Sequence, residues 1–98
     1  MNLFEVSKAA RSDLKNIAAY TQKNWGAKQR RVYLAKLDSA FHFLAANPLA
    51  GTPCSYILEG LRRHQVASHL IFYDLVNKRV FINRVLHSSV DFKRHLSG

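Results

Sequence analysis

Residues 17–44, IAAYTQKNWGAKQRRVYLAKLDSAFHFL, decide the fold of this chain, because one glycine divides them into two amphipathic helices. Apolar side chains recur every three or four residues on both sides of Gly26, which is the spacing of one helix face. The two stripes are Ala10, Leu14, Ile17, Ala18, Thr21 and Trp25 before the glycine, and Tyr33, Leu34, Leu37, Ala40, Phe41 and Leu44 after it. We expect Gly26 to end the first helix in the left-handed conformation that glycine adopts without strain. A single intervening residue predicts an antiparallel helical hairpin.

Short segments without helical periodicity flank the hairpin. Residues 3–6 are long enough for one strand, and Ser7 is placed to cap the helix that follows. Asn47-Pro48 ends the second helix, and the prolines and glycine within residues 47–59 indicate an irregular connector.

Beyond Gly60 the periodicity changes from that of helices to that of strands. β-Branched and aromatic residues dominate three segments, namely 61–66, 69–75 and 80–86. Asn77-Lys78 suits the tight turn between the last two, and residues 91–96 are expected to form a short helical turn. The sequence thus predicts a single α+β domain over residues 1–98. It begins with an N-terminal strand, continues with an antiparallel helical hairpin and a three-stranded β-meander in one sheet, and ends with a short C-terminal helical turn.

The charge balance is the most informative bulk property of the chain. Of its 98 residues 48% are hydrophobic, so we expect one folded domain and not a disordered chain. Fifteen Lys and Arg oppose six Asp and Glu, which gives a net charge of +9. Residues 1–46 hold eight basic and three acidic side chains, and residues 60–98 hold seven and two, so the excess is spread through the domain. Such a surface attracts polyanions, either nucleic acid or an acidic protein segment.

Several features bear on the compartment and on cofactors. No apolar run approaches the roughly 18 residues of a membrane-spanning helix, and residues 1–8 lack the pattern of a signal peptide, so no membrane partner is expected. Cys54 is the only cysteine, which excludes an intramolecular disulfide and fits the reducing cytoplasm. The histidines do not fall at the spacing of a metal site, and we expect neither a metal nor a cofactor.

Short motifs follow one another in a single register from about residue 8 to residue 96. They are Ala10-Arg11-Ser12-Asp13-Leu14 with Ile17 and Tyr20, Trp25-Gly26, Tyr33-Leu34 with Leu37 and Leu44, Asn47-Pro48 with Gly51, Gly60-Leu61-Arg62-Arg63, Ser68-His69-Leu70-Ile71-Phe72-Tyr73, and Val85-Leu86-His87 with Asp91. In this order they resemble the ParE branch of the RelE/ParE superfamily, the toxins of bacterial toxin–antitoxin pairs. Val85 and Val90 stand where the family usually has Ile and Met, and both differences are apolar exchanges.

The resemblance implies a RelE/ParE-like fold and a type II toxin that binds DNA gyrase and halts replication, with no catalytic residue of its own. It also implies a ParD-like antitoxin whose flexible, acidic C-terminal tail wraps the toxin in a hetero-oligomeric complex. An acidic tail suits a domain of charge +9. From the charges near the C-terminus and the family analogy we expect a gyrase-binding surface made of Arg62, Arg63, Arg84, His87, Asp91, Lys93 and Arg94.

A second stripe on the helix after Gly26 points to the antitoxin. Val32, Lys36, Ser39 and Phe43 lie roughly opposite the main apolar stripe on a helical wheel of ~100° per residue. Two of them are apolar and would be partly exposed. We therefore expect an antitoxin helix to dock on these four residues.

Two other functions stay open. The RelE branch cleaves mRNA on the ribosome, and in such an enzyme His87 would be the base while Arg62, Arg63 and Arg84 would hold the phosphate. Residues 85–98 contain no tyrosine, however, where the RNases of the superfamily place one. The third possibility is a non-toxic module that binds nucleic acid with steep salt dependence. Such a module would stack nucleic-acid bases on aromatic side chains. We expect instead that Phe72, Tyr73 and Phe81 face the hairpin as core residues.

Overall fold

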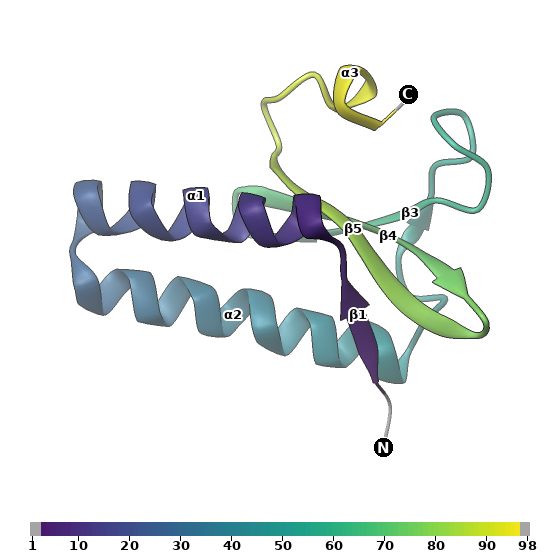
Figure 1. The fold of residues 1–98 in the computed structure, drawn as a ribbon, viewed down its shortest axis with the longest axis horizontal. Coiled ribbons are helices and arrows are strands. Elements are labelled where there is room, and N and C mark those ends of the chain that lie inside the picture. The colour runs from purple at the N-terminus through teal and green to yellow at the C-terminus, as the bar shows by residue number, and fades with distance from the viewer. Residues whose placement is uncertain (1–2, 97–98) are drawn as a thin grey trace.

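The structure, a computed structural model, describes residues 3–96, except the side chains of Phe92 and Lys93. Strand β1 (Phe4–Val6) leads into α1 (Lys8–Trp25) and α2 (Ala27–Ala46), which lie antiparallel (Figure 1). The remaining elements are β2 (Thr52–Pro53), β3 (Arg62–Val66), β4 (His69–Val76), β5 (Arg79–His87) and α3 (Phe92–Leu96). The predicted order of strand, helical hairpin, meander and C-terminal helical turn is confirmed.

The five strands form one sheet in the order β1-β5-β4-β3-β2. β1 runs parallel to β5, and each of the other neighbouring pairs is antiparallel. The short strand β2 lies in the segment predicted to be irregular, and Pro53 is tolerated there because an edge strand leaves one side without partners. β2 pairs only with Arg62 and Arg63.

Gly26 is the corner of the hairpin. Its N–H donates to the carbonyl of Gln22 and its carbonyl accepts from Arg30, so it ends α1 and begins α2. Its φ of +93° confirms the expected positive value, but its ψ of 169° is extended, so the expected left-handed helical conformation is wrong. This backbone region is accessible almost exclusively to glycine.

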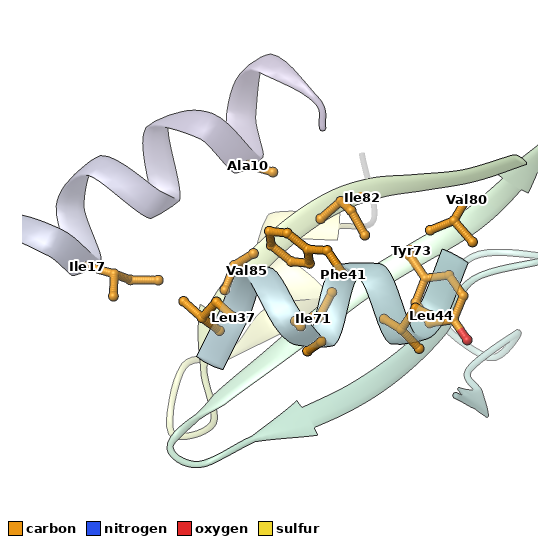
Figure 2. Packing of buried hydrophobic residues seen from close by; sticks show 11 residues of the cluster. Ala10, Ile17, Leu37, Phe41, Leu44, Ile71, Tyr73, Val80, Ile82 and Val85 are labelled. Atoms are coloured by element: carbon orange, nitrogen blue, oxygen red, sulfur yellow. The ribbon is translucent and has the colours of Figure 1, made fainter. Parts of the chain in front are cut away.

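Two hydrophobic clusters cover the two faces of the sheet. The larger lies between the sheet and the hairpin and contains Ala10, Ile17, Leu37, Ala40, Phe41, Leu44, Ile71, Tyr73, Val80, Ile82 and Val85 (Figure 2). The smaller contains Cys54, Leu61, Leu70, Phe72 and Leu86, against which Ile57 and Leu96 pack. Tyr73 therefore faces the hairpin as predicted, whereas Phe72 does not, because consecutive residues of a strand point to opposite faces. Phe81 is only half-buried.

A β-bulge in β5 makes this packing possible. Tyr73 pairs with Ile82 and Phe72 pairs with Arg84, so Asn83 has no partner across the ladder. The extra residue shifts the alternation by one position. As a result Val80, Ile82 and Val85 all belong to the cluster beneath the hairpin, although strict alternation would place Val85 on the other face.

The hairpin is fastened to the outer edge of β5 by side chains of Ser7 and α1. β1 pairs with Val80, Phe81 and Ile82 only. Beyond it, the Ser7 hydroxyl donates to the Asn83 carbonyl and accepts from Ala10 N–H as the helix cap, as predicted. Next along the edge, Asp13 accepts the Val85 N–H at 2.9 Å and receives two bonds of 2.8 Å from the Arg84 guanidinium.

Asp13 thus serves as the partner of Arg84 and does not lie in the first turn of α1, which holds no acidic residue. Only 11% of its side chain and 23% of that of Arg84 are exposed. Burial of a charge is favourable only when it is paired and hydrogen-bonded, and both conditions hold here.

A second clamp holds the connector that follows α2. The Tyr73 hydroxyl donates to the Pro48 carbonyl and accepts from Gly51 N–H, both at 2.8 Å. A Cβ on Gly51 would lie 2.5 Å from that hydroxyl oxygen, so only glycine fits. Arg62 completes the clamp by donating to the carbonyls of Leu49 and Gly51.

Among the described residues, no helix combines the length and the apolar character needed to cross a membrane.

Replacement of Asp13 by alanine is expected to lower the free energy of unfolding by about 2–4 kcal/mol, since it leaves a half-buried Arg84 charge and the Val85 N–H without an acceptor. Asp13→Asn retains one acceptor oxygen and should cost less. Asp38 is the matched control, because it is 65% exposed and its pair with His42, at 3.5 Å, lies on the surface. Asp38→Ala should change stability by less than about 0.5 kcal/mol. Urea denaturation measures both, and equal losses would contradict the assigned role of Asp13.

Candidate functional site

The residues predicted to contact gyrase do not form one cluster. Arg63 pairs with Phe72 and so faces away from the hairpin, on the side of the sheet where Leu96 of α3 packs. Asp91 and Arg94 are exposed near that end of the chain, and the Lys93 side chain lies outside the described residues. His87 pairs with His69, which bonds to Tyr33 of α2, so His87 lies on the hairpin side.

Two of the predicted arginines have structural partners. Arg62 donates to the carbonyls of the connector, and Arg84 is bound by Asp13. The hydrogen bond to Asp13 raises the pKa of Arg84 further above its ordinary value. These two guanidinium groups are therefore less available to an external phosphate or carboxylate than the sequence indicated.

The structure gathers aromatic and histidine side chains around His87 that the sequence did not bring together. We name this set the histidine cleft and define it as Tyr20, Trp25, Tyr33, His69 and His87. The rings of His69 and His87 meet edge to face with centroids 5.3 Å apart. The Tyr33 hydroxyl is hydrogen-bonded to Nδ1 of His69. The cleft therefore spans the hairpin and the ends of two strands.

The orientation of His87 is fixed by the residues after it. Ser89 N–H donates to Nδ1 of His87 at 3.1 Å, and the Ser89 hydroxyl lies 2.7 Å from the same nitrogen. Because Nδ1 accepts, the neutral ring carries its proton on Nε2. His87 can thus offer Nε2–H to a ligand as a hydrogen-bond donor.

Burial governs the protonation of the inner part of the cleft. Desolvation lowers the pKa of His69 below its ordinary 6.5, and the neighbouring His87 lowers it further. Desolvation likewise raises the pKa of Tyr33, against a smaller opposing effect of the Ser68 backbone. At neutral pH we therefore expect an uncharged His69 and a protonated Tyr33 in contact with each other.

Two hollows open onto the histidine cleft, and Tyr20, His69 and His87 line both. The first, of about 470 Å³, is completed by Asp13, Asn16, Ile17, Val85, Leu86 and Ser89. The second, of about 510 Å³, is completed by Thr21, Trp25, Gln29, Tyr33 and Ser68. Among the side chains that the structure describes, no lysine or arginine lines either hollow, and the only carboxylate is that of Asp13, which Arg84 binds.

Neither a metal site nor a cysteine nucleophile arises from the described side chains. Within residues 3–96, apart from Phe92 and Lys93, no three His, Cys, Asp or Glu residues are grouped so that they would hold an ion. Cys54 is fully buried in the smaller cluster, and burial raises the pKa of its thiol. A protonated, inaccessible thiol is a poor nucleophile.

The predicted antitoxin stripe borders a groove between α2 and β3. Val32, Lys36 and Ser39 line this groove of about 540 Å³ together with Gln65 and Val66 of β3. Phe43 lies one turn further along α2, half-exposed, with its ring 5.6 Å from that of His64. Past Arg63, no strand among residues 3–96 covers the outer edge of β3.

The sequence placed Trp25 on the apolar stripe of the first helix, whereas its side chain is 71% exposed, and it did not bring Trp25 together with His69 and His87. Counting outward from the Asn77-Lys78 turn places His69 opposite Leu86, and only the extra residue Asn83 moves it opposite His87. The available signal was the pair of histidines at the outer ends of the last two predicted strands.

Comparison with known proteins agrees with this architecture. Residues 4–92 match the family model of the "ParE toxin of type II toxin-antitoxin system, parDE". Toxin ParE1 of Caulobacter vibrioides is 35% identical over 96 residues, which cover 98% of this chain and 99% of the relative. Toxin ParE1 of Mycobacterium tuberculosis is 36% identical over 92 residues, covering 93% and 94%.

Solved structures show the same fold at lower identity. A chain of the chromosomal ParDE system of Pseudomonas aeruginosa superposes with a TM-score of 0.77 at 19% identity, covering 89% of this chain and 96% of that one. A chain of the Escherichia coli DinJ–YafQ complex gives a TM-score of 0.63 at 20% identity, with coverages of 94% and 99%. On the strength of the family match and of these relatives, the chain belongs to the ParE toxin family of type II toxin–antitoxin systems, within the RelE/ParE superfamily.

Proposed function

We propose that this toxin inhibits DNA gyrase by binding to it, and that a ParD-like antitoxin neutralises it in a hetero-oligomeric complex in the cytoplasm. The observation that carries the proposal is that no lysine or arginine with a described side chain lines the hollows around His87. A pair of histidines such as His69 and His87, without a lysine or arginine beside it, lacks the group that stabilises the charge of a phosphoryl transition state. Family membership and the net charge of +9 support a protein that acts by occupying surfaces.

The predicted gyrase contacts stay a proposal, with one refinement. Arg63, His87, Asp91, Lys93 and Arg94 remain the proposed contact residues. Arg62 and Arg84 bind other parts of the fold, so we expect their substitution to reduce stability together with gyrase binding.

An endoribonuclease is the second candidate, and the contact between His69 and His87 is the observation that favours it. Two imidazoles in one open cleft would supply a base and an acid. Such an enzyme would cut mRNA within translating ribosomes and would lose this activity on His87→Ala.

Gyrase inhibition is tested with the purified toxin, gyrase and relaxed plasmid. We expect the toxin to suppress supercoiling or to raise the amount of cleaved DNA complexes. In a parallel assay with translating ribosomes, we expect the mRNA to remain uncut. The His87→Ala variant is measured beside the unmodified toxin in both assays. If supercoiling is unimpaired and mRNA cleavage depends on His87, the gyrase proposal is wrong. The protein would then be an endoribonuclease.

The antitoxin surface is proposed to be the groove beside α2, centred on Val32, Lys36, Ser39 and Phe43. The half-exposed Val32 and Phe43 supply apolar contacts, and Lys36 supplies a positive charge for an acidic tail. Toxin–antitoxin complexes among the structural neighbours support a partner of this class.

Phe43→Glu is expected to weaken antitoxin binding by roughly tenfold to a hundredfold, because it places a carboxylate in an apolar contact opposite an acidic partner. Growth arrest on expression without antitoxin should persist. Leu49→Glu is the matched control, since Leu49 is 69% exposed and lies in the connector after α2, and it does not line the groove. Titration calorimetry with the antitoxin measures the change, and equal affinities of the two variants would remove this surface from the proposal.

A further inference from the structure

Two large aromatic side chains stand exposed at the C-terminal half of α1. Trp25 is 71% exposed and Tyr20 is 66% exposed. Both border the 510 Å³ hollow of the histidine cleft. Tryptophan and tyrosine bury large apolar areas in folded proteins and are the residue types most enriched among energetic hot spots of protein interfaces. Their exposure beside a hollow therefore points to a partner that covers them.

The charge of the cleft identifies the class of partner. A nucleic acid would need lysine or arginine for its phosphates, and an acidic tail would need them for its carboxylates. The chain has fifteen such residues, yet none of those with a described side chain lines the two hollows. The lining therefore favours an uncharged protein surface over either polyanion.

The lining defines what that surface presents. Ile17 and Val85 supply apolar area in the first hollow, which Tyr20 also lines. His87 offers Nε2–H, because its Nδ1 accepts from Ser89. A complementary partner presents an aliphatic or aromatic side chain beside a hydrogen-bond acceptor such as a backbone carbonyl.

We propose that the histidine cleft, with Trp25 and Tyr20 at its rim, is the hot spot with which this toxin holds gyrase, an apolar gyrase side chain filling the hollow. The inference rests on the proposed function. His87 connects the two, because it is a predicted gyrase contact and lines both hollows. Exposed charges such as Arg63 and Arg94 then speed the encounter, and the uncharged cleft sets the lifetime of the complex.

The test compares the affinity for gyrase of the full-length toxin with that of Trp25→Ala and Tyr20→Ala. Each variant should bind gyrase about tenfold or more weakly, mainly through faster dissociation, and should lose inhibition of supercoiling in proportion. Trp25→Phe should recover part of the affinity, because it restores an aromatic ring. Leu49→Ala, which removes an equally exposed apolar side chain outside the cleft, should bind as the unmodified toxin does.

The antitoxin affinity and the thermal unfolding of each variant serve as controls for correct folding. Neither should change, because both side chains are mostly exposed. Trp25→Ala and Tyr20→Ala variants that bind gyrase like the unmodified toxin would overturn the inference and leave the proposed function intact. A toxin that does not bind gyrase at all would overturn the proposed function, and the inference with it. A change of oligomeric state in the two variants with unaltered gyrase affinity would also overturn the inference, and would assign the cleft to a second copy of the chain.

Discussion

The carboxylate of Asp13 joins two parts of the chain that are 71 residues apart, and the arrangement of the two layers depends on it. The short strand β1 covers only three residues of β5, which leaves the rest of that edge with unpaired backbone groups. Ser7 and Asp13 bind those groups directly. A helix that is hydrogen-bonded to the edge of a sheet cannot slide along it, so α1 has one position, and α2 follows through the single residue Gly26.

The same edge explains how a cleft forms beside His87. The bulge at Asn83 turns Val85 toward the hairpin and brings His87 opposite His69. With α1 fixed by Asp13, its later turns carry Tyr20 and Trp25 to the rim of this histidine pair, and α2 brings Tyr33 to His69. A local irregularity in one strand and an ion pair at its edge are therefore the two features that create the hollow.

The basic residues of this toxin and the aromatic residues of its histidine cleft lie on different surfaces. The basic residues are spread over the whole chain and act at a distance, on the rate at which an acidic or mixed partner arrives. Two of those nearest the predicted site, Arg62 and Arg84, stabilise the fold instead. The histidine cleft has the opposite character, with aromatic rings and neutral polar groups. The two kinds of surface differ in what they do, since long-range attraction selects partners poorly and apolar contact selects them well.

The sequence by itself determined the order of the elements other than β2, because helical and strand periodicities and their glycine and proline boundaries are local properties of the chain. Gly26, Ser7 and the Asn77-Lys78 turn were each placed correctly from neighbouring residues, and the family motifs carried the class of toxin. Only the tertiary structure decided which charges are free and where His87 points. Those outcomes depend on the register of β4 against β5 and on a carboxylate from the opposite half of the chain, and neither is encoded in the spacing of nearby residues. One inserted residue in a strand leaves the apolar pattern almost unchanged, yet it reverses the face of every side chain that follows it.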